Sequence, residues 1–271
     1  MKKNSLGRKL AFASADIFGG GSFNIINFLF PGFLALTVGI TPFWSGFIVF
    51  IARAWDSITD PVMGYISDHT KSRFGKRRIY LIISAPLVVV GMYFLFFPYS
   101  FSSEALRIIA VLLSYLVFTT IQTSIMIPYY SLSSEISSDY QERASYNSYR
   151  LGFSIFASII CVAVPGIIVG MFDNEGTGYQ VMSLIFGFLF GFAVLMTGLF
   201  VKEEINTPIV SSKFSLKEMA KPLSLKPFRQ YLGMFLVLQM SMAIMSGLFF
   251  FYVDFYIKKT LPQVVVRQWW A

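Results

Sequence analysis

The chain has 271 residues, of which 55% are hydrophobic and 13% are charged, with 30 phenylalanines. Soluble domains hold about 25% charged residues, so this composition excludes an ordinary soluble domain and indicates a membrane protein. The net charge of +8 would suit nucleic-acid binding if the basic residues formed a surface stripe, but they lie between apolar runs. One cysteine, Cys161, excludes an internal disulfide framework, and one histidine, His69, excludes a His-rich metal site.

A transmembrane helix needs about 20 mainly apolar residues, and seven such windows follow one another along the chain. They are residues 12–38, 44–66, 79–99, 105–133, 148–172, 179–201 and 231–257. The first window is too long for a signal-peptide core and is followed by further spans, so we expect it to be retained. The sequence therefore predicts an all-α polytopic membrane protein with about seven transmembrane helices.

The basic residues predict the orientation of these spans. Sixteen of the 22 Lys and Arg lie in the N-terminal segment and in the segments after the second, fourth and sixth spans. The connections near residues 40–42, 99–100 and 173–176 hold none. Because cytoplasmic loops carry the excess of basic residues, we expect a cytoplasmic N-terminus and a multi-pass protein of the cell's inner (cytoplasmic) membrane.

Three regions follow from the spacing of the spans. Residues 1–201 are predicted to form a six-helix transmembrane bundle, and residues 202–230 a cytoplasmic linker rich in Lys, Ser and Pro. Residues 231–271 are predicted to hold the first helix of an incomplete C-terminal bundle. Six helices, a linker and one further helix make an unbalanced arrangement, so we expect a truncated chain.

The second span carries three charged residues, Arg53, Asp56 and Asp60, at positions i, i+3 and i+7 of one helical face. A charge at mid-bilayer costs about 2.5–3.5 kcal/mol, so this face is expected to point into the bundle. Arg53 balances one carboxylate, and the remaining negative charge beside Thr59 suits a sodium ion or a proton. The alternative is a structural ion-pair cluster in the bundle interior.

Further polar residues lie inside other spans. Arg150 could bind a polyhydroxylated or anionic ligand with forked hydrogen bonds, or extend to the nearby interface. In the fourth span, Gln122 and Tyr130 are candidate solute contacts, although a tyrosine in so aromatic a chain could equally serve packing. The first span offers, on one face, Gly20, Asn24 and Asn27, which could bind a solute or join helices.

Two sequence blocks resemble the glycoside-pentoside-hexuronide:cation symporter family, the melibiose-permease branch of the major facilitator superfamily. The first block runs over residues 53–64 and 67–78, and the second over residues 127–132 with Glu135, Asp139, Glu142, Arg143 and Arg150. The resemblance covers about residues 8–257 and implies the N-terminal half of a twelve-helix fold plus helix seven. It also implies cation-coupled symport of a sugar, glycoside or sugar acid, and the substrate class stays open among glycosides, pentosides, hexuronides and lipid-like solutes.

Residue by residue, the resemblance implies a cation site for Na⁺ or H⁺ made of Asp56, Thr59, Asp60 and Thr123, and no other cofactor or metal. Melibiose permease has Asn where Thr59 stands. Arg150 and Tyr130 match its sugar-site arginine and tryptophan, whereas its two galactoside-binding carboxylates fall at Gly20 and Met126 here, so melibiose-type specificity is not expected. The gating residues that the resemblance implies are Arg53, Asp68, Arg73, Gly75, Arg77, Glu135 and Arg143.

Functions other than transport fit parts of the sequence. A seven-helix membrane sensor fits the number of spans, but its N-terminus would lie outside and no lysine stands midway along the seventh span. A non-transporting fragment of a symporter gene fits the family without activity. An enzyme is not expected, since no nucleophile-base pair or metal-ligand cluster occurs. We expect the truncated chain to be inactive in concentrative transport, and a homodimer could cover its exposed inner face.

Overall fold

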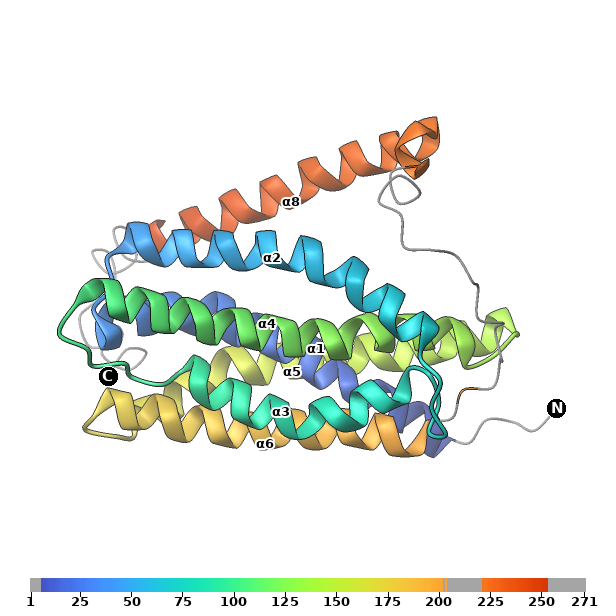
Figure 1. Ribbon diagram of the computed structural model, residues 1–271, viewed down its shortest axis with the longest axis horizontal. Coiled ribbons are helices and arrows are strands. Elements are labelled where there is room, and N and C mark those ends of the chain that lie inside the picture. The colour runs from blue at the N-terminus through green and yellow to red at the C-terminus, as the bar shows by residue number, and fades with distance from the viewer. Residues whose placement is uncertain (1–5, 202, 204–220, 253–271) are drawn as a thin grey trace. The chain divides into compact units, whose positions relative to one another are not determined.

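The computed structural model describes residues 6–201, 203 and 221–252, and these residues contain no strand. The first of two compact units covers residues 1–211. Its helices are α1 (Leu6–Gly32), which continues as the π-helix η1 (Phe33–Val38), α2 (Pro42–His69), α3 (Arg78–Leu95), α4 (Glu104–Glu135), α5 (Tyr140–Gly170) and α6 (Glu175–Phe200) (Figure 1). The prediction of an all-α polytopic fold is confirmed.

The second unit covers residues 212–271. Its described part is a short 3₁₀-helix η2 (Lys221–Ser224) and the helix α8 (Lys226–Tyr252). The helix begins at residue 226 rather than at the predicted 231, because Pro227 at the second helical position favours a helix start there. Residues 253–257 of the predicted span lie outside the described residues, and so does most of the predicted linker.

Other helix ends also differ from the prediction: α1 begins at Leu6 rather than at 12, and two further differences have local reasons. The third span was expected to reach residue 99, but α3 ends at Leu95, since the residue before Pro98 disfavours helical backbone. The fifth span was expected to begin at residue 148, but α5 begins at Tyr140. There the Asp139 side chain caps the helix by accepting a hydrogen bond of 3.1 Å from the backbone N–H of Gln141.

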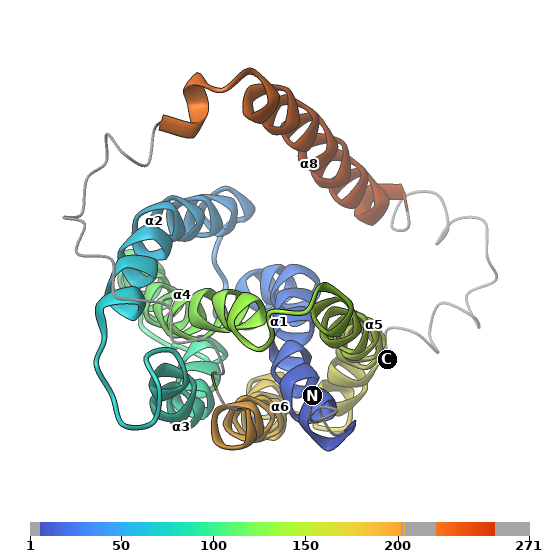
Figure 2. The ribbon, with the colours of Figure 1, turned by 90° about the vertical axis from the view of Figure 1, so that its right-hand side faces the viewer.

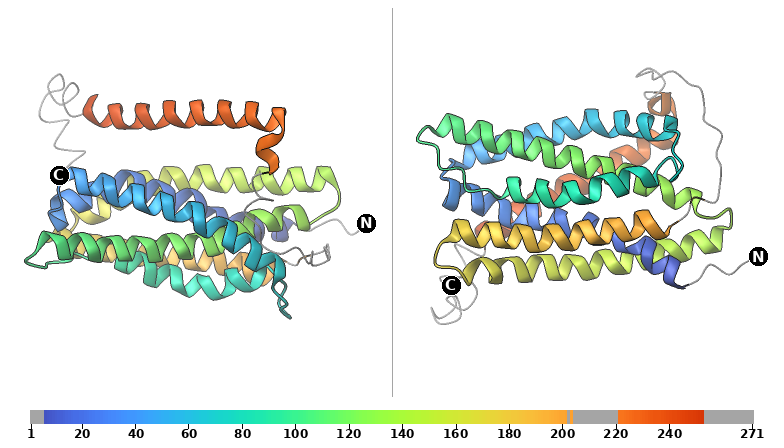
Figure 3. Two further views of the ribbon diagram at one scale, coloured as in Figure 1. Left: turned by 45° about the horizontal axis from the view of Figure 1, so that its top comes forward. Right: turned by 60° about the horizontal axis from the view of Figure 1, so that its bottom comes forward.

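Helix α1 is the central helix of the first unit. It packs against α5 and α6, while α3 packs against α4 and α6, and α2 packs against α4. Figure 2, which looks along these helices, shows α1 with α4, α5 and α6 around it. The two views of Figure 3 show the same nearly parallel arrangement of α1 to α6.

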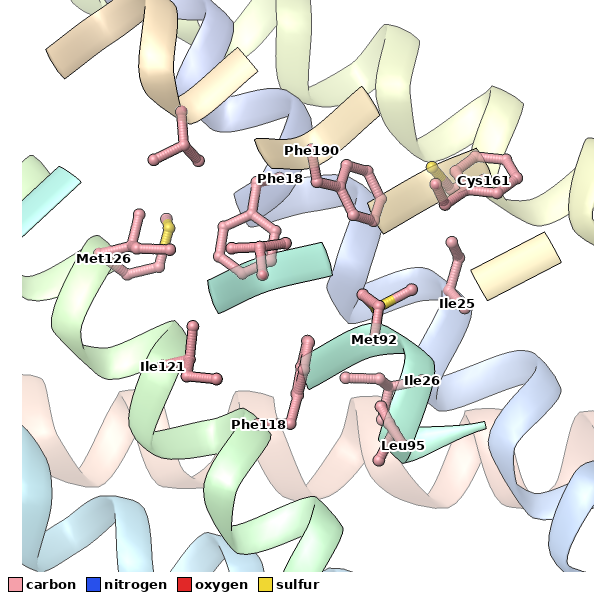
Figure 4. Packing of buried hydrophobic residues seen from close by; sticks show 14 of the residues in the cluster. Phe18, Ile25, Ile26, Met92, Leu95, Phe118, Ile121, Met126, Cys161 and Phe190 are labelled. Carbon is pink, nitrogen blue, oxygen red and sulfur yellow. The ribbon is translucent and has the colours of Figure 1, made fainter. Parts of the chain in front are cut away.

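Aromatic side chains fill the space between these helices. Phe18 of α1 contacts Phe118 of α4 and Phe190 of α6, with ring centroids 6.3 and 5.6 Å apart. Met92 of α3 belongs to the same buried cluster (Figure 4). The same cluster includes Ala52 of α2 and Cys161 of α5, so the two helices that carry the intramembrane charges pack against this core.

Five helices of the described chain are long and apolar enough to cross a membrane: α1 with η1, α3, α4, α5 and α6. Helix α2 has a comparable length of 28 residues but carries Arg53, Asp56 and Asp60 near its middle. Its charged face therefore requires protein contacts rather than lipid contacts.

One end of the first unit is rich in basic residues, and we call it the basic end. The start of α1, the turn between α2 and α3, the turn between α4 and α5 and the end of α6 all lie there (Figure 1). At the opposite end, the first turn of α4 carries Arg107, which donates a hydrogen bond of 2.7 Å to the Val38 carbonyl. That arginine lies inside a predicted span and was not part of the loop charge count.

Candidate functional site

A pair of carboxylates on α2 faces α4 in the middle of the first unit. Thr123 of α4 donates a hydrogen bond of 2.8 Å to Asp60 Oδ1. Asp56, one turn earlier, forms an ion pair of 3.5 Å with Arg53, and its own Oδ1 is buried without a hydrogen bond among the described residues. The two carboxylates interact electrostatically with each other. Three of the four predicted cation-site residues thus lie together.

The fourth predicted cation-site residue, Thr59, turns its hydroxyl onto its own helix. It donates to the backbone carbonyls of Trp55 and Asp56, at 3.2 and 3.5 Å. Thr119 of α4 lies beside Asp56, and its hydroxyl donates to the Leu116 carbonyl. The oxygen atoms arranged around this pair are therefore carboxylate and hydroxyl groups, which are the ligand types that hard cations prefer.

Arg150 of α5 lies in a second polar group with Asp16 of α1 and Tyr130 of α4. Its Nε atom is 3.7 Å from Asp16 Oδ2, and its guanidinium carbon lies 5.4 Å from the centroid of the Tyr130 ring. The same Nε atom is buried and makes no hydrogen bond among the described residues. Tyr130 also interacts electrostatically with Asp60, so the two polar groups are neighbours.

The other predicted solute contacts serve mainly to join helices. Asn24 of α1 donates a hydrogen bond of 2.9 Å to Ser158 of α5, and Gln122 of α4 donates one of 3.2 Å to Ser22 of α1. A Cβ atom at Gly20 would lie 2.4 Å from Ser154 Oγ, so Gly20 allows α1 and α5 to approach closely. Asn27 is exposed on the unit's surface. A role in solute binding stays a prediction for all four.

An ion-pair cluster at the basic end gathers three of the predicted gating residues, Asp68, Arg77 and Glu135, and a fourth, Gly75, lies in the turn beside it. Arg77 is buried and donates from Nε and Nη2 to the two carboxylate oxygens of Glu135, at 2.9 and 3.0 Å. Its Nη2 also donates to Asp68 Oδ1 at 2.7 Å, and Lys76 Nζ lies 2.9 Å from Glu135 Oε1. Burial lowers the pKa of Arg77, but hydrogen bonds and charge from Glu135 and Asp68 outweigh burial and raise that pKa above its ordinary value.

The turn before Arg77 contains Gly75, whose φ of 109° is a backbone conformation that suits glycine. The carboxylate of Glu203, just beyond α6, closes over this turn. It accepts hydrogen bonds from the backbone N–H groups of Lys76, Arg77 and Arg78, at 3.1, 2.9 and 3.2 Å. The turn is therefore held from α4 by Glu135 and from the chain after α6 by Glu203.

Three predicted gating residues do not join this cluster in the described part of the chain. Arg53 pairs with Asp56 and lies over the Phe23 ring at 5.8 Å from its centroid. Arg73 is exposed and lies over the Phe74 ring at 5.2 Å. Arg143 lies in the first turn of α5, where its backbone N–H donates to the Asp139 carbonyl.

Sequence reasoning gave no role to three residues of these groups: Asp16, Lys76 and Glu203. A carboxylate inside an apolar segment requires a partner, so Asp16 could have been matched to Arg150, an intramembrane cation on another span. Glu203 gave a weaker signal, because an acidic residue after a span is usually solvated. A sequence offers no sign that its carboxylate returns to a turn more than 100 residues earlier.

Comparison with known proteins agrees with this architecture. The chain is 33% identical over 177 residues to the sodium-dependent lysophosphatidylcholine symporter 1-B of Danio rerio, covering 60% of this chain and 34% of that protein. It is 29% identical over 238 residues to an uncharacterized symporter of Synechocystis, covering 82% of this chain and 43% of that protein. An uncharacterized symporter of Bacillus subtilis is 27% identical over 211 residues, covering 76% of this chain and 45% of that protein.

The chain thus spans less than half the length of these curated relatives. The family of MFS/sugar transport proteins matches residues 11–266, which is nearly the whole chain. Helices α2 to α6 and all but the first five residues of α1 lie within this match, with the carboxylate pair of α2 and the basic-end cluster. The chain therefore belongs to the MFS/sugar transport protein family, within the major facilitator superfamily.

Proposed function

We propose that this chain supplies the cation site and part of the solute site of a secondary active symporter coupled to Na⁺ or H⁺. The observation that carries this proposal is the carboxylate pair of α2, in which Asp60 accepts a hydrogen bond from Thr123 and Asp56 Oδ1 accepts none from the described part of the chain. Arg53 balances one of the two charges, so one negative charge is left for a monovalent cation. A structural ion-pair cluster would have no such excess.

Binding of ²²Na⁺ to the purified 271-residue chain in detergent tests this proposal. We expect saturable binding that disappears when Asp56 and Asp60 are both changed to Asn, because the site then has no negative charge. The Asp68→Asn variant is the matched control, since Asp68 is a carboxylate of the same helix at the basic end. Binding that survives the double change would overturn the assignment, and so would a wild-type chain that binds neither Na⁺ nor a proton at these carboxylates.

The solute is proposed to carry hydroxyl or anionic oxygen atoms, because Arg150 has a buried Nε–H that none of the described residues accepts, and a guanidinium recognises such groups. A sugar, glycoside or sugar acid is the first candidate, in keeping with the family. A lysophospholipid head group is the second, because several relatives with 31–34% identity are lysophosphatidylcholine symporters.

Competition in binding assays separates the two candidates. The chain would be incubated with a panel of labelled glycosides and hexuronates and with labelled lysophosphatidylcholine, each in the presence of Na⁺ and of K⁺. A cation-dependent signal that Arg150→Gln abolishes identifies the solute class. A signal that is the same in this variant and in wild type assigns the bound compound to another surface.

Orientation and activity complete the proposal. We propose that the basic end faces the cytoplasm and that the 271 residues alone do not concentrate solute. Alternating access in this superfamily is a movement of one six-helix half against the other around a midplane site. A homodimer could imitate the two halves, and uptake by proteoliposomes that hold these 271 residues decides the question. Accumulation against a gradient would refute the expected inactivity.

A further inference from the structure

Glu203 binds the backbone of the turn that precedes α3. Its Oε1 atom accepts hydrogen bonds from the N–H groups of Arg77 and Arg78, and its Oε2 atom accepts one from Lys76. Arg78 is the first residue of α3 and Arg77 is its N-cap, and the first N–H donors of a helix have no partner within the helix. A carboxylate at this place is favoured both by the hydrogen bonds and by the helix dipole.

The turn leaves no space for a side chain beneath this carboxylate. A Cβ atom at Gly75 would lie 2.6 Å from Glu203 Oε1 and 2.8 Å from its carboxylate carbon. The positive φ favours glycine at position 75, and a side chain there would also displace the Glu203 carboxylate. The absence of a side chain at Gly75 therefore leaves room for the Glu203 carboxylate.

A second contact joins the same two segments in the opposite sense. Arg78, at the start of α3, donates from Nε to the Gly198 carbonyl at 2.9 Å and from Nη2 to the Leu199 carbonyl at 2.8 Å. These carbonyls belong to the last turn of α6, where cations are favoured. Glu203, which follows α6, thus caps the start of α3, and Arg78, at the start of α3, caps the end of α6. We call this pair of contacts the α3–α6 clamp.

The clamp lies directly beside the ion-pair cluster, because Arg77 takes part in both. Its backbone N–H binds Glu203, while its guanidinium binds Glu135 and Asp68. We propose that Glu203 is a positioning residue of the gating cluster. By fixing the backbone of the turn it holds Arg77 on its two carboxylate partners, and it joins the chain that continues after α6 to this cluster.

Cysteine accessibility tests this role. Ser67 is fully buried one residue before Asp68, so a Ser67→Cys reporter in a Cys161→Ser background measures opening at the basic end. Reaction with a hydrophilic maleimide would be followed in detergent. Hydrogen bonds to a charged group contribute enough that removing the charge in Glu203→Gln should speed the reaction about tenfold. Glu203→Asp, which keeps the charge, should react more slowly than Glu203→Gln.

A purely structural role would loosen the bundle everywhere, so a second reporter is needed. Ser183→Cys serves this purpose, since Ser183 is fully buried in α6 away from the basic end. Glu175→Gln is the matched control variant, because Glu175 is the first residue of α6 at the opposite end. Neither the Ser183→Cys rate in Glu203→Gln nor the Ser67→Cys rate in Glu175→Gln should change.

Three outcomes would overturn the proposal: an unchanged Ser67→Cys rate in Glu203→Gln, an equal rise at both reporters, or a Glu203→Asp rate equal to that of Glu203→Gln. If Glu203→Gln does not fold, Arg78→Lys weakens the other half of the clamp and is read in the same way. A gating role for this cluster rests on the proposed transport function, whereas the cysteine experiment measures accessibility alone. A negative result in Na⁺ binding and a negative result here are therefore separate findings.

Discussion

Thr123 offers the most direct test of how the α2 carboxylates are held. Its hydroxyl is buried and donates a hydrogen bond of 2.8 Å to Asp60 Oδ1. Replacement by Val keeps the shape of the side chain but removes the donor from a buried charge. A hydrogen bond to a charged group contributes about 1.5–3 kcal/mol. Thr123→Val should therefore lower the free energy of unfolding by about 2 kcal/mol, or the melting temperature by about 4–8 °C for a unit of this size.

Sodium should reveal whether the same hydroxyl helps to bind the cation. A ligand at one hundred times its Kd stabilises the folded state by about 2.7 kcal/mol, and a tenfold loss of affinity reduces this to about 1.4 kcal/mol. The Thr123→Val chain should thus gain about half the stabilisation of wild type when K⁺ is exchanged for Na⁺. Thermal unfolding in detergent, followed by the fluorescence of the four tryptophans, measures both effects.

Thr120→Val is the matched control for this experiment. Thr120 lies on the same helix, is exposed, and accepts a hydrogen bond of 3.0 Å from Trp55 Nε1, which is a neutral group. Its replacement should cost less than 1.5 kcal/mol and leave the sodium response unchanged. The reasoning is refuted if Thr123→Val melts at the wild-type temperature and keeps the full sodium response.

Three further predictions concern topology and the basic end. A tag at position 175 should be accessible from outside the cell and a tag at position 215 only after permeabilisation, as the loop charges require; reversed labelling would contradict the span assignment. Gly75→Ala should lower the free energy of unfolding by about 1–3 kcal/mol, because φ is positive there, and an unchanged melting temperature would show that the turn adapts. Arg77→Gln should cost about 3 kcal/mol in the same assay, since it leaves the buried Glu135 with one cation fewer, whereas a cost below 1 kcal/mol would mean that the pair is solvated.

The fold could be predicted from the sequence because its main signal is local. Each span is a run of apolar residues long enough to cross a bilayer, and Arg53, Asp56 and Asp60 reveal a shared helical face by their spacing alone. The helix ends were less predictable, since they depend on single contacts. The cap from Asp139 extends α5 by two turns beyond its apolar part.

The site was predicted less completely, because its contacts join distant parts of the chain. The pairing of Asp60 with Thr123 was anticipated through family resemblance rather than through spacing. The partner of Arg150 and the clamp around Gly75 depend on how α1 packs against α5 and α3 against α6. A single sequence gives the chemical types of such residues, but tertiary packing decides which of them meet.

The net charge inside the described helices predicts how many cations the proposed site would bind. Away from the helix ends, α1, α2 and α5 carry five charged residues: Asp16, Arg53, Asp56, Asp60 and Arg150. Asp16 pairs with Arg150 and Asp56 with Arg53, which leaves the charge of Asp60 with a hydroxyl as its partner. A hydroxyl satisfies a carboxylate's hydrogen bond but does not neutralise it, so the interior retains one negative charge. We therefore expect one Na⁺ or one proton per chain. Tyr130 belongs to the group of Arg150 and Asp16 and also interacts electrostatically with Asp60, so we expect that a solute that displaces Asp16 from Arg150 would change the electrostatic field at Asp60 and link solute binding to cation binding.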